Sequence, residues 1–335
     1  MAPEKILIFR QSSLGDVILA LTVVNCLKGK FPAAQIDFIT KEQYLPVIQH
    51  HPSIRMAHGF ASNGELVKII GNFGNVSFDY YIDLQSNIRS ILLGLSLGKV
   101  SVLRYKKRRL ARMMIVRRPQ RKLAVEHTVL AYQKCLASLG IEPTMSVPDI
   151  HLPEAAIRSA EEFYRSYGIA KGVAIAICPG AKHVEKRWPW SEFKELALRF
   201  LGAPNSRIIV ISARNDEIPE NLGIQNSRLV HAIDLPITQV AAVLAGCRLA
   251  ITNDSGLMHL ANAVGTKVLA IFGPTNPRLG FAPADSGSRI ICDDVPCSPC
   301  SLHGERKCYQ PRKYCFENIG ASRVYDESKS MIENG

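Results

Sequence analysis

The sequence has no apolar run long enough to cross a membrane. A transmembrane helix needs about 18 or more consecutive apolar residues, whereas the longest candidate, residues 91–97, is far shorter and contains Gly94 and Ser96. No long apolar segment precedes a cleavage site near the N-terminus, where residues 6–9 are instead predicted to be a strand. We therefore expect neither a membrane-spanning segment nor a secretion signal, and we expect a cytoplasmic protein.

Acidic residues are missing from residues 104–122, where ten basic residues gather. The chain carries 41 Lys and Arg against 29 Asp and Glu, a net charge of +12, and only +2 remains outside this basic run. Such concentrated charge favours a binding surface, with a solvated loop as the alternative. Nucleic acid and a phosphorylated glycolipid on an anionic membrane both match the charge, but Tyr105 is the one aromatic residue in the run and no nucleic-acid-binding module surrounds it.

Short repeats and low-complexity tracts are also absent, and 335 residues exceed the usual size of one hydrophobic core. A segment with three prolines, residues 142–153, is the predicted linker between two halves in which apolar strands alternate with helices. We expect strands at residues 5–9, 36–40, 80–84, 173–177, 207–211, 248–251 and 267–272, and helices at residues 16–28, 64–74, 127–139, 155–167, 191–201, 237–245 and 256–264. This alternation predicts two doubly wound parallel α/β domains.

Three polar segments follow apolar strands, at the ends where open parallel sheets bind ligands. They are residues 11–16, Gln-Ser-Ser-Leu-Gly-Asp; residues 178–189, which begin Cys-Pro-Gly-Ala and end Lys-Arg-Trp-Pro; and residues 251–259, Ile-Thr-Asn-Asp-Ser-Gly-Leu-Met-His. Ser255 and Gly256 begin a predicted helix, so their backbone amides have no intrahelical acceptor and suit a phosphate. His259 lies one turn later. Capping of this helix by Asp254 or Ser255 is the alternative.

These segments, in this order and at this spacing, resemble the family 9 glycosyltransferases, the ADP-heptose:lipopolysaccharide heptosyltransferases, and most closely their heptosyltransferase II branch. The likeness extends over residues 4–280. It implies a GT-B fold, in which two Rossmann-like domains face a central cleft. Residues 1–153 would bind the acceptor, residues 154–316 would bind the nucleotide sugar, and a helix within residues 317–335 would pack back on the N-terminal domain.

The resemblance also implies an activity and its partners. The enzyme would transfer L-glycero-D-manno-heptose, with inversion, from ADP-heptose to the inner core of lipopolysaccharide. It would act without a catalytic cofactor, at the cytoplasmic face of the inner membrane. ADP-heptose, the inner-core glycolipid and the anionic membrane surface are the expected partners, and nucleic acid is not. The basic run is then assigned to the acceptor through Arg104, Arg108, Arg109 and Arg112.

Individual residues acquire roles from the resemblance. Asp16 matches the base that takes the proton from the acceptor hydroxyl, with capping of the following helix as its alternative. Lys186 matches the partner of the donor diphosphate, with an exposed lysine as its alternative. Gly180 and Ala181 bring backbone amides near the nucleotide, where relatives have threonines. The other donor-site assignments are Ser13, Gly15, Asp216 at the ribose, Leu235 at the adenine, Asp254 at the sugar, Ser255, Gly256, and His259, which contacts phosphate or orients Asp254.

Three other functions compete with this interpretation. One is a nucleotide-sugar transferase with a different donor, and another is a basic nucleic-acid-binding protein. The third is a dinucleotide-dependent dehydrogenase, which is disfavoured because residues 11–16 contain one glycine where that fingerprint needs three.

Five of the nine cysteines lie in the last part of the chain. Four of them form the pattern Cys297-x2-Cys300-x7-Cys308-x6-Cys315, and Cys292 precedes them. Four thiolates at short spacing suit a tetrahedral zinc or iron ion that would hold a loop without its own core. Four reduced thiols are the alternative, and disulfides are less expected without a secretion signal.

Overall fold

The computed structural model describes residues 2–74, 76–170 and 172–334, and the chain divides into two compact units. Unit 1 comprises Met1–Lys107 and His127–Leu152, and unit 2 comprises Arg108–Glu126 and Pro153–Gly335. The chain passes from unit 1 to unit 2 for the last time between Leu152 and Pro153, inside the proline-rich segment. Among the described residues, none of the helices combines the length and the hydropathy needed to traverse a bilayer.

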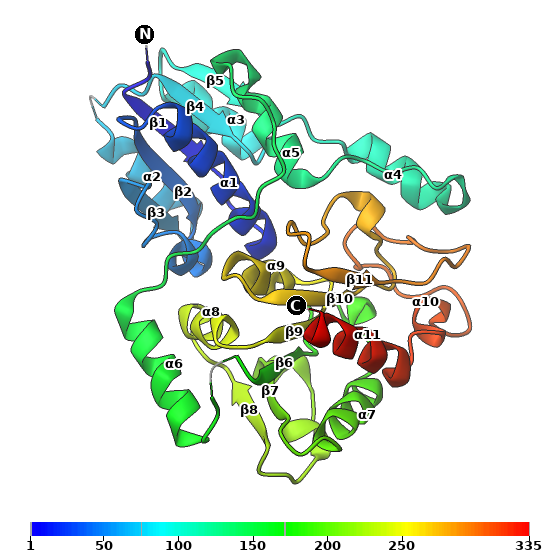
Figure 1. Ribbon diagram of the computed structural model, residues 1–335. Helices are drawn as coiled ribbons and strands as arrows, with labels where there is room; N and C mark the ends of the chain where they lie inside the picture. Colours follow the sequence, from blue (N-terminus) through cyan, green and yellow to red (C-terminus); the bar gives the residue numbers. More distant parts are fainter. Residues whose placement is uncertain (1, 75, 171, 335) are drawn as a thin grey trace. The chain divides into compact units, whose positions relative to one another are not determined.

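Unit 1 is built on a five-stranded parallel sheet of order β3-β2-β1-β4-β5 (Figure 1). Its strands are β1 (Lys5–Phe9), β2 (Gln35–Lys41), β3 (Met56–Phe60), β4 (Tyr80–Asp83) and β5 (Ser101–Arg104). Its helices are α1 (Leu14–Lys30), η1 (Glu42–Val47), α2 (Asn63–Asn72), α3 (Ile88–Ser96), α5 (Thr128–Gln133) and η3 (Lys134–Leu139). The central strand β1 pairs with β2 and β4, and its continuous apolar sequence suits a strand that is covered on both faces.

Unit 2 has a six-stranded parallel sheet of order β11-β10-β9-β6-β7-β8. Its strands are β6 (Ala174–Cys178), β7 (Arg207–Ser212), β8 (Leu229–Ile233), β9 (Leu249–Asn253), β10 (Lys267–Ile271) and β11 (Arg289–Ile291). Its helices are α4 (Arg109–Arg117), η2 (Pro119–Arg121), α6 (Glu154–Ser166), η4 (Val184–Lys186), α7 (Trp190–Leu201), η5 (Arg214–Asp216), η6 (Glu220–Gly223), α8 (Ile237–Ala245), α9 (Gly256–Ala263), η7 (Pro277–Leu279), α10 (Tyr314–Glu317) and α11 (Ala321–Glu333). The order is that of a doubly wound sheet, whose direction of winding reverses between β6 and β9.

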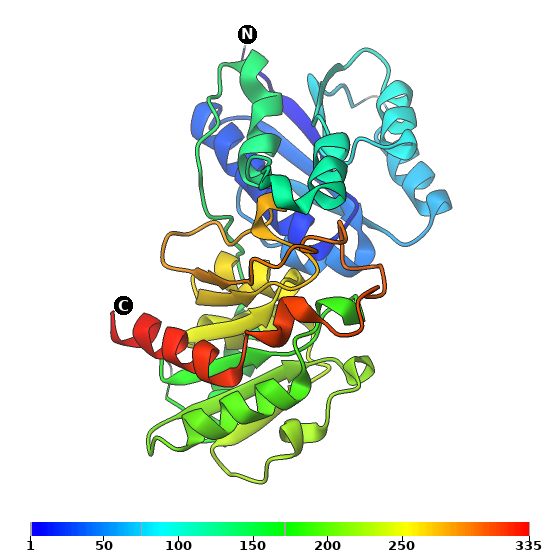
Figure 2. The ribbon, with the colours of Figure 1, turned by 90° about the vertical axis from the view of Figure 1, so that its right-hand side faces the viewer.

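The terminal helix α11 does not follow the prediction that it packs on the N-terminal domain. It lies along α7 in unit 2, as Figures 1 and 2 both show. Val324 and Met331 enter the same hydrophobic cluster as Phe200, and the rings of Phe200 and Tyr325 have centroids 4.9 Å apart. The amphipathic pattern of α11 requires a buried face, and unit 2 supplies the apolar surface that covers it.

The basic run also departs from its predicted place in the N-terminal domain. Residues 108–126 leave unit 1, form α4 and η2 in unit 2, and return. Arg112 fastens this excursion, because its Nε donates to the carbonyl of Leu279 at 3.0 Å and its guanidinium lies 4.5 Å from the centre of the Phe281 ring. The Arg112 guanidinium, which contacts both an aromatic ring and a carbonyl, is thus one of several contacts that hold the basic run in unit 2.

Candidate functional site

In unit 1 the site forms where α1 begins, just after the central strand β1. Asp16 Oδ2 accepts hydrogen bonds from the backbone nitrogen of Ser13 at 3.1 Å and from Ser13 Oγ at 2.8 Å. Its Oδ1 accepts from the Tyr132 hydroxyl at 2.9 Å and pairs with Arg10 Nη2 at 2.9 Å. The predicted residues Ser13, Gly15 and Asp16 therefore lie in one turn. Asp16 takes part in capping α1, as the alternative had it, and also belongs to a polar network.

The charge state of Asp16 follows from this network. Burial alone would raise its pKa, but the Arg10 ion pair and the hydrogen bonds from Ser13 and Tyr132 hold that pKa below its ordinary value. Burial, conversely, raises the pKa of Tyr132 well above its ordinary value. The Tyr132 hydroxyl therefore stays protonated and donates a hydrogen bond to Asp16. At neutral pH the site presents a carboxylate anion, the form that can accept a proton.

Arg104 is engaged within unit 1. Its Nε donates to Asp83 Oδ2 at 2.8 Å, at the carboxyl end of β4, and this aspartate is fully buried. Nearby, Arg89 Nη1 donates to Gln11 Oε1 at 2.7 Å, and the backbone nitrogen of Gln11 donates to Gln85 Oε1 at 3.1 Å. The polar residues beyond β4 were not predicted as part of the site, although their position at a strand end is the signal that could have found them.

In unit 2 two predicted residues from different segments meet as a largely buried ion pair. Lys186 Nζ lies 2.6 Å from Asp254 Oδ2, and the two side chains are 14% and 11% exposed. The same carboxylate oxygen accepts a hydrogen bond from Thr275 Oγ1 at 2.6 Å. Lys186 is therefore not the solvent-exposed lysine of the alternative. Its charge is held at the carboxyl end of β9, beside the start of α9.

Asn253 joins the second and third polar segments. Its Nδ2 donates to the carbonyl of Pro179 at 2.7 Å, and its Oδ1 accepts from the backbone nitrogen of Trp188 at 3.0 Å. Its side chain is fully buried. One amide thereby fixes the turn after β6, the turn before α7 and the turn after β9. This residue was not singled out from the sequence, because an asparagine at a strand end is more often a simple turn former.

Gly180 and Asp216, predicted separately, lie in direct contact. A Cβ atom at Gly180 would stand 2.2 Å from Asp216 Oδ2, so only glycine leaves room for this carboxylate. Asp216 Oδ1 accepts from Arg187 Nη2 at 2.9 Å, and Oδ2 accepts from the backbone nitrogen of Ala213 at 2.9 Å. Arg187 Nε also donates to the carbonyl of Ala181 at 2.9 Å. The ends of β6 and β7 are thus held together around one carboxylate.

The start of α9 carries the remaining predicted donor residues. Ser255 precedes the first helical residue, Gly256, and the Ser255 Oγ atom is buried without a hydrogen-bond partner among the described residues. His259 is buried within the same helix. Leu235, by contrast, is partly buried between β8 and α8. The amides at the start of a helix attract anions, and Lys186 is paired with Asp254, two residues before the first residue of α9.

The basic helix α4 presents a mixed face to solvent. Leu110 and Met114, one turn apart, are 78% and 54% exposed, and Arg109 and Arg117 are exposed as well. Arg108, in contrast, forms an ion pair with Glu126. Of the four arginines assigned to the acceptor, Arg104, Arg108 and Arg112 therefore have partners within their own units.

A histidine–aspartate cluster lies in unit 1 and was not predicted. Asp149 contacts His51 Nε2 at 3.5 Å and His151 Nε2 at 3.0 Å, and Asn25 Nδ2 donates to it at 2.5 Å. These three titratable groups are close enough to share an ion. However, His51 Nδ1 accepts from the backbone nitrogen of Ser53 at 3.2 Å, which in a neutral ring leaves the hydrogen on Nε2. Nε2 then carries a hydrogen on the side that faces Asp149, so it does not offer a lone pair to a metal ion.

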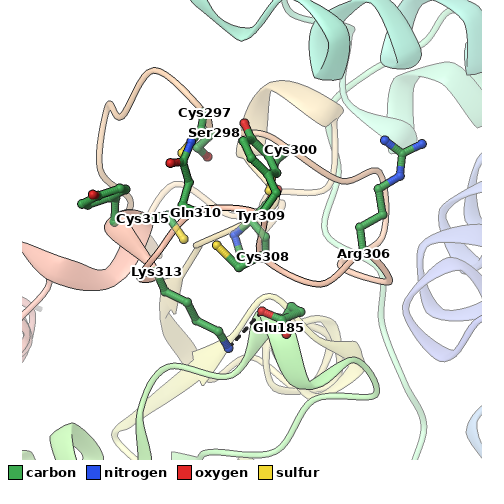
Figure 3. Close-up of a pocket in the computed structure, with 12 residues that line it drawn as sticks. Glu185, Cys297, Ser298, Cys300, Arg306, Cys308, Tyr309, Gln310, Lys313 and Cys315 are labelled. Atoms are coloured by element: carbon green, nitrogen blue, oxygen red, sulfur yellow. Dashed lines mark hydrogen bonds and ion pairs between the residues drawn. The ribbon is translucent and has the colours of Figure 1, made fainter.

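The four patterned cysteines lie in one stretch of unit 2. Cys297, Cys300, Cys308 and Cys315 line a single pocket (Figure 3), whereas Cys292 is not among its lining residues. All of them are free thiols. Burial raises the pKa of Cys300 to about 11 and that of Cys315 to about 12.

Comparison with known proteins places the chain among sugar transferases. The model of glycosyltransferase family 9 (heptosyltransferase) matches residues 66–309. The chain is 27% identical to lipopolysaccharide heptosyltransferase 1 of Pseudomonas aeruginosa over 98% of each chain. Its structure resembles a family 9 glycosyl transferase of Veillonella parvula (TM-score 0.82, 21% identity, 99% and 98% of the two chains covered). It also resembles ADP-heptose lps heptosyltransferase II of E. coli (TM-score 0.73, 18% identity, 98% and 99% covered). The predicted α/β fold with two doubly wound sheets, of the GT-B type, is confirmed.

Proposed function

Because the chain belongs to glycosyltransferase family 9, the heptosyltransferases, we propose that it transfers L-glycero-D-manno-heptose from ADP-heptose to the inner core of lipopolysaccharide, with inversion. The relative from Pseudomonas aeruginosa, a lipopolysaccharide heptosyltransferase by name, supports the acceptor class. The observation that carries the proposal is the largely buried Lys186–Asp254 pair beside the start of α9. It provides a cation, free helix amides and a carboxylate where a sugar diphosphate needs all three.

The donor diphosphate binds at the carboxyl ends of β6 and β9, where the sheet reverses its winding and open α/β sheets hold their ligands. Lys186 exchanges Asp254 for the diphosphate, whose charge also meets the amide of Gly256 and the Ser255 hydroxyl. As the bond to the heptose breaks, this positive charge stabilises the departing ADP. Asp254, released from Lys186, accepts hydrogen bonds from hydroxyls of the heptose.

The nucleoside lies toward β7 and β8. Asp216 keeps unused lone pairs after its bonds to Arg187 and Ala213, and these accept the ribose hydroxyls. Gly180 is required because its lack of a side chain lets the carboxylate approach. The backbone at Leu235, just after β8, contacts the adenine. His259, buried in α9, supports the phosphate end of the donor.

Asp16 is the base for the acceptor hydroxyl. Its low pKa means that it takes the proton only as the hydroxyl becomes acidic during attack on the anomeric carbon. Arg10 and Tyr132 hold the carboxylate in one orientation for that transfer. Ser13 and Gly15 shape the turn on which it lies.

The exposed face of α4 supports a peripheral association with the cytoplasmic face of the inner membrane. Leu110 and Met114 offer apolar contact, and the neighbouring Arg109 and Arg117 offer charge to anionic headgroups. Of the four arginines assigned to the acceptor, Arg109 is then the one that contacts the lipid. Arg104, Arg108 and Arg112 act by shaping their surroundings, since each has a partner within its unit.

The donor assignment is tested by thermal unfolding with a panel of nucleotide sugars. A ligand present at 100 times its Kd stabilises the native state by about 2.7 kcal/mol. ADP-heptose should raise the Tm most, ADP less, and UDP-glucose or GDP-mannose hardly at all. An equal rise with the UDP sugar would overturn the donor assignment. Transfer of radiolabelled heptose to a heptose-deficient core glycolipid then tests the acceptor.

A further inference from the structure

The segment that carries the patterned cysteines contacts the turn around Lys186 at two points. We define the cysteine loop as residues 292–313, between β11 and α10. Gly304 of this loop lies so close to Lys186 that a Cβ atom there would stand 2.2 Å from Lys186 Cγ and 2.6 Å from Cδ. On the other side, Lys313 Nζ pairs with Glu185 Oε2 at 3.1 Å, as Figure 3 shows. The position of the predicted diphosphate cation therefore depends on how firmly the cysteine loop is held.

The cysteine loop has little regular structure with which to hold itself. None of residues 292–313 is in a helix or a strand, and loops of this length without such elements are uncommon in compact domains. Its attachment to the sheet is made mostly by backbone contacts. The nitrogens of Cys300 and Ser301 donate to the carbonyl of Pro274 at 3.0 and 3.2 Å, and Ser298 Oγ donates to the carbonyl of Gly273 at 2.9 Å. These contacts fix one end of the loop, near Cys297 and Cys300, whereas the other end leads into α10, whose Cys315 and Phe316 are buried in the hydrophobic core of unit 2.

The four cysteines are placed where they can join these two ends directly. Cys297 and Cys300 come from the end that is fixed on Pro274, Cys308 comes from the returning part of the loop, and Cys315 lies in α10 directly after it. All four line one pocket. Figure 3 shows side chains from both ends converging on it. Arg306 and Lys313 line the same pocket. Their positive charge suits a centre in which four thiolates around a divalent ion leave a net negative charge.

We propose that Cys297, Cys300, Cys308 and Cys315 bind one zinc or iron(II) ion as thiolates, and that this ion, by joining the two ends of the cysteine loop, positions Lys186 for the donor diphosphate. The four thiols lose four protons as the divalent ion binds, and no electron is transferred. Tetrahedral coordination with metal–sulfur distances of about 2.3 Å requires the sulfurs to lie about 3.8 Å apart. In the described structure no three of these sulfurs lie within 4.8 Å of one another, so binding of the ion requires the cysteine side chains to turn toward a common point in the pocket. The ion is structural, because Asp16 and the diphosphate contacts do not include it.

The metal site is tested first by composition, with a control from within the same loop. The purified full-length protein should contain about one equivalent of zinc or iron, the stoichiometry of a closed four-ligand site. Iron would add a visible thiolate-to-metal absorption band, and zinc would not. Cys308→Ser should lose the metal, whereas Cys292→Ser, which changes a cysteine outside the pocket, should retain it. Metal-free protein whose four thiols are all alkylated in the native state would overturn the site, as would four thiols protected without any metal.

The positioning of Lys186 is tested by kinetics and rests on the proposed function. Removal of the ion with a chelator should raise the KM for ADP-heptose about tenfold or more, with a smaller effect on kcat, and restored metal should reverse the change. Glu185→Gln should reproduce part of the rise while keeping the metal, because it weakens the Lys313 contact and leaves all four cysteines in place. An unchanged donor KM in chelated, folded protein would overturn the positioning role. Metal-loaded protein that does not bind ADP-heptose at all would instead count against the proposed function, and the metal content would stand apart from that result.

Discussion

Each unit holds one carboxylate in an ion pair just beyond a central parallel strand, yet the two pairs are built differently. Asp16 forms an ion pair with Arg10 and also accepts hydrogen bonds from Ser13 and the Tyr132 hydroxyl. Asp254 receives Lys186 and the Thr275 hydroxyl. A guanidinium has a rigid fork of donors, whereas an ammonium on a flexible stem is a movable point charge. The pair in unit 1 is therefore suited to keeping one charge state, and the pair in unit 2 to exchanging its partner.

Substitution of Asp16 is expected to have the largest effect on transfer activity. Asp16→Asn keeps the shape but removes the proton acceptor, so transfer should fall by about 10²–10⁴-fold, the usual contribution of a positioned base. Binding of ADP, measured by calorimetry, should be nearly unchanged, because the donor residues of unit 2 are untouched. Near-normal turnover would show that Asp16 only caps α1.

Lys186→Ala tests the exchangeable pair. It removes the diphosphate cation and leaves Asp254 buried without its partner, so kcat/KM for the donor should fall by about 10²–10³-fold. ADP binding should weaken as well, unlike in Asp16→Asn. Lys182→Ala, which removes an exposed lysine from the same loop, is the matched control and should have little effect. Equal losses from both variants would point to a diffuse electrostatic effect.

The exposed face of α4 offers a test outside both pairs. Arg109→Gln with Arg117→Gln should weaken binding to vesicles that contain phosphatidylglycerol by about 30-fold, since each basic residue near an anionic surface contributes about 1 kcal/mol. A control that removes two other exposed charges of unit 2, Arg158→Gln with Lys329→Gln, should change binding less. Vesicle sedimentation measures both, and identical behaviour of the two double variants would rule out a specific surface on α4.

Gly180→Ala tests whether Asp216 holds the ribose of the donor. The new methyl group would stand 2.2 Å from Asp216 Oδ2, so the carboxylate must move. We expect about tenfold weaker ADP binding, in line with the usual cost of overpacking. Gly29→Ala is the control, because nothing lies within 4 Å of its Cβ position. Wild-type affinity in Gly180→Ala would mean that Asp216 does not hold the ribose.

The ion pair between Asp16 and Arg10 also predicts how the free energy of unfolding depends on pH. The pKa of Asp16 in the folded protein is below the usual value of about 3.9, so the unfolded chain binds this proton more readily. The stabilisation is therefore complete above about pH 4 and is lost as the pH falls through the folded pKa. Urea unfolding from pH 7 to pH 3 should show the difference between wild type and Asp16→Asn shrinking at the acid end. A difference that grows there would contradict the ion pair.

The strands that the sequence predicts are those with continuous apolar runs, such as β1 and β6. The edge strand β3 (Met56–Phe60) was not predicted, because its sequence, Met-Ala-His-Gly-Phe, has neither such a run nor a clear alternation. Helix α4 was hidden within the basic run, whose charge dominates the pattern. The amphipathic sequence of α11 indicates that one face is buried, but it cannot tell which domain covers that face.

The same limit applies to the site. Asp16, Lys186 and Asp254 stand in recognisable segments at strand ends, and the structure brings Lys186 and Asp254 together. Tyr132 could not be found in this way, because it reaches Asp16 from 116 positions along the chain. Arg10 immediately precedes the first polar segment, but its partner depends on which way its side chain turns after β1. Residues whose roles arise from long-range contacts can be identified only once the fold is known.

The excursion of residues 108–126 has a consequence for synthesis. Arg112 meets Leu279, and Lys122 meets Asp294, across 167 and 172 positions of sequence. At translation rates of about 5–20 residues per second, the basic segment leaves the ribosome roughly 10–30 s before its partners exist. During that interval a strongly cationic, partly apolar stretch is exposed in the cell. The contacts that hold this segment in unit 2 can therefore form only after the second unit has been synthesised.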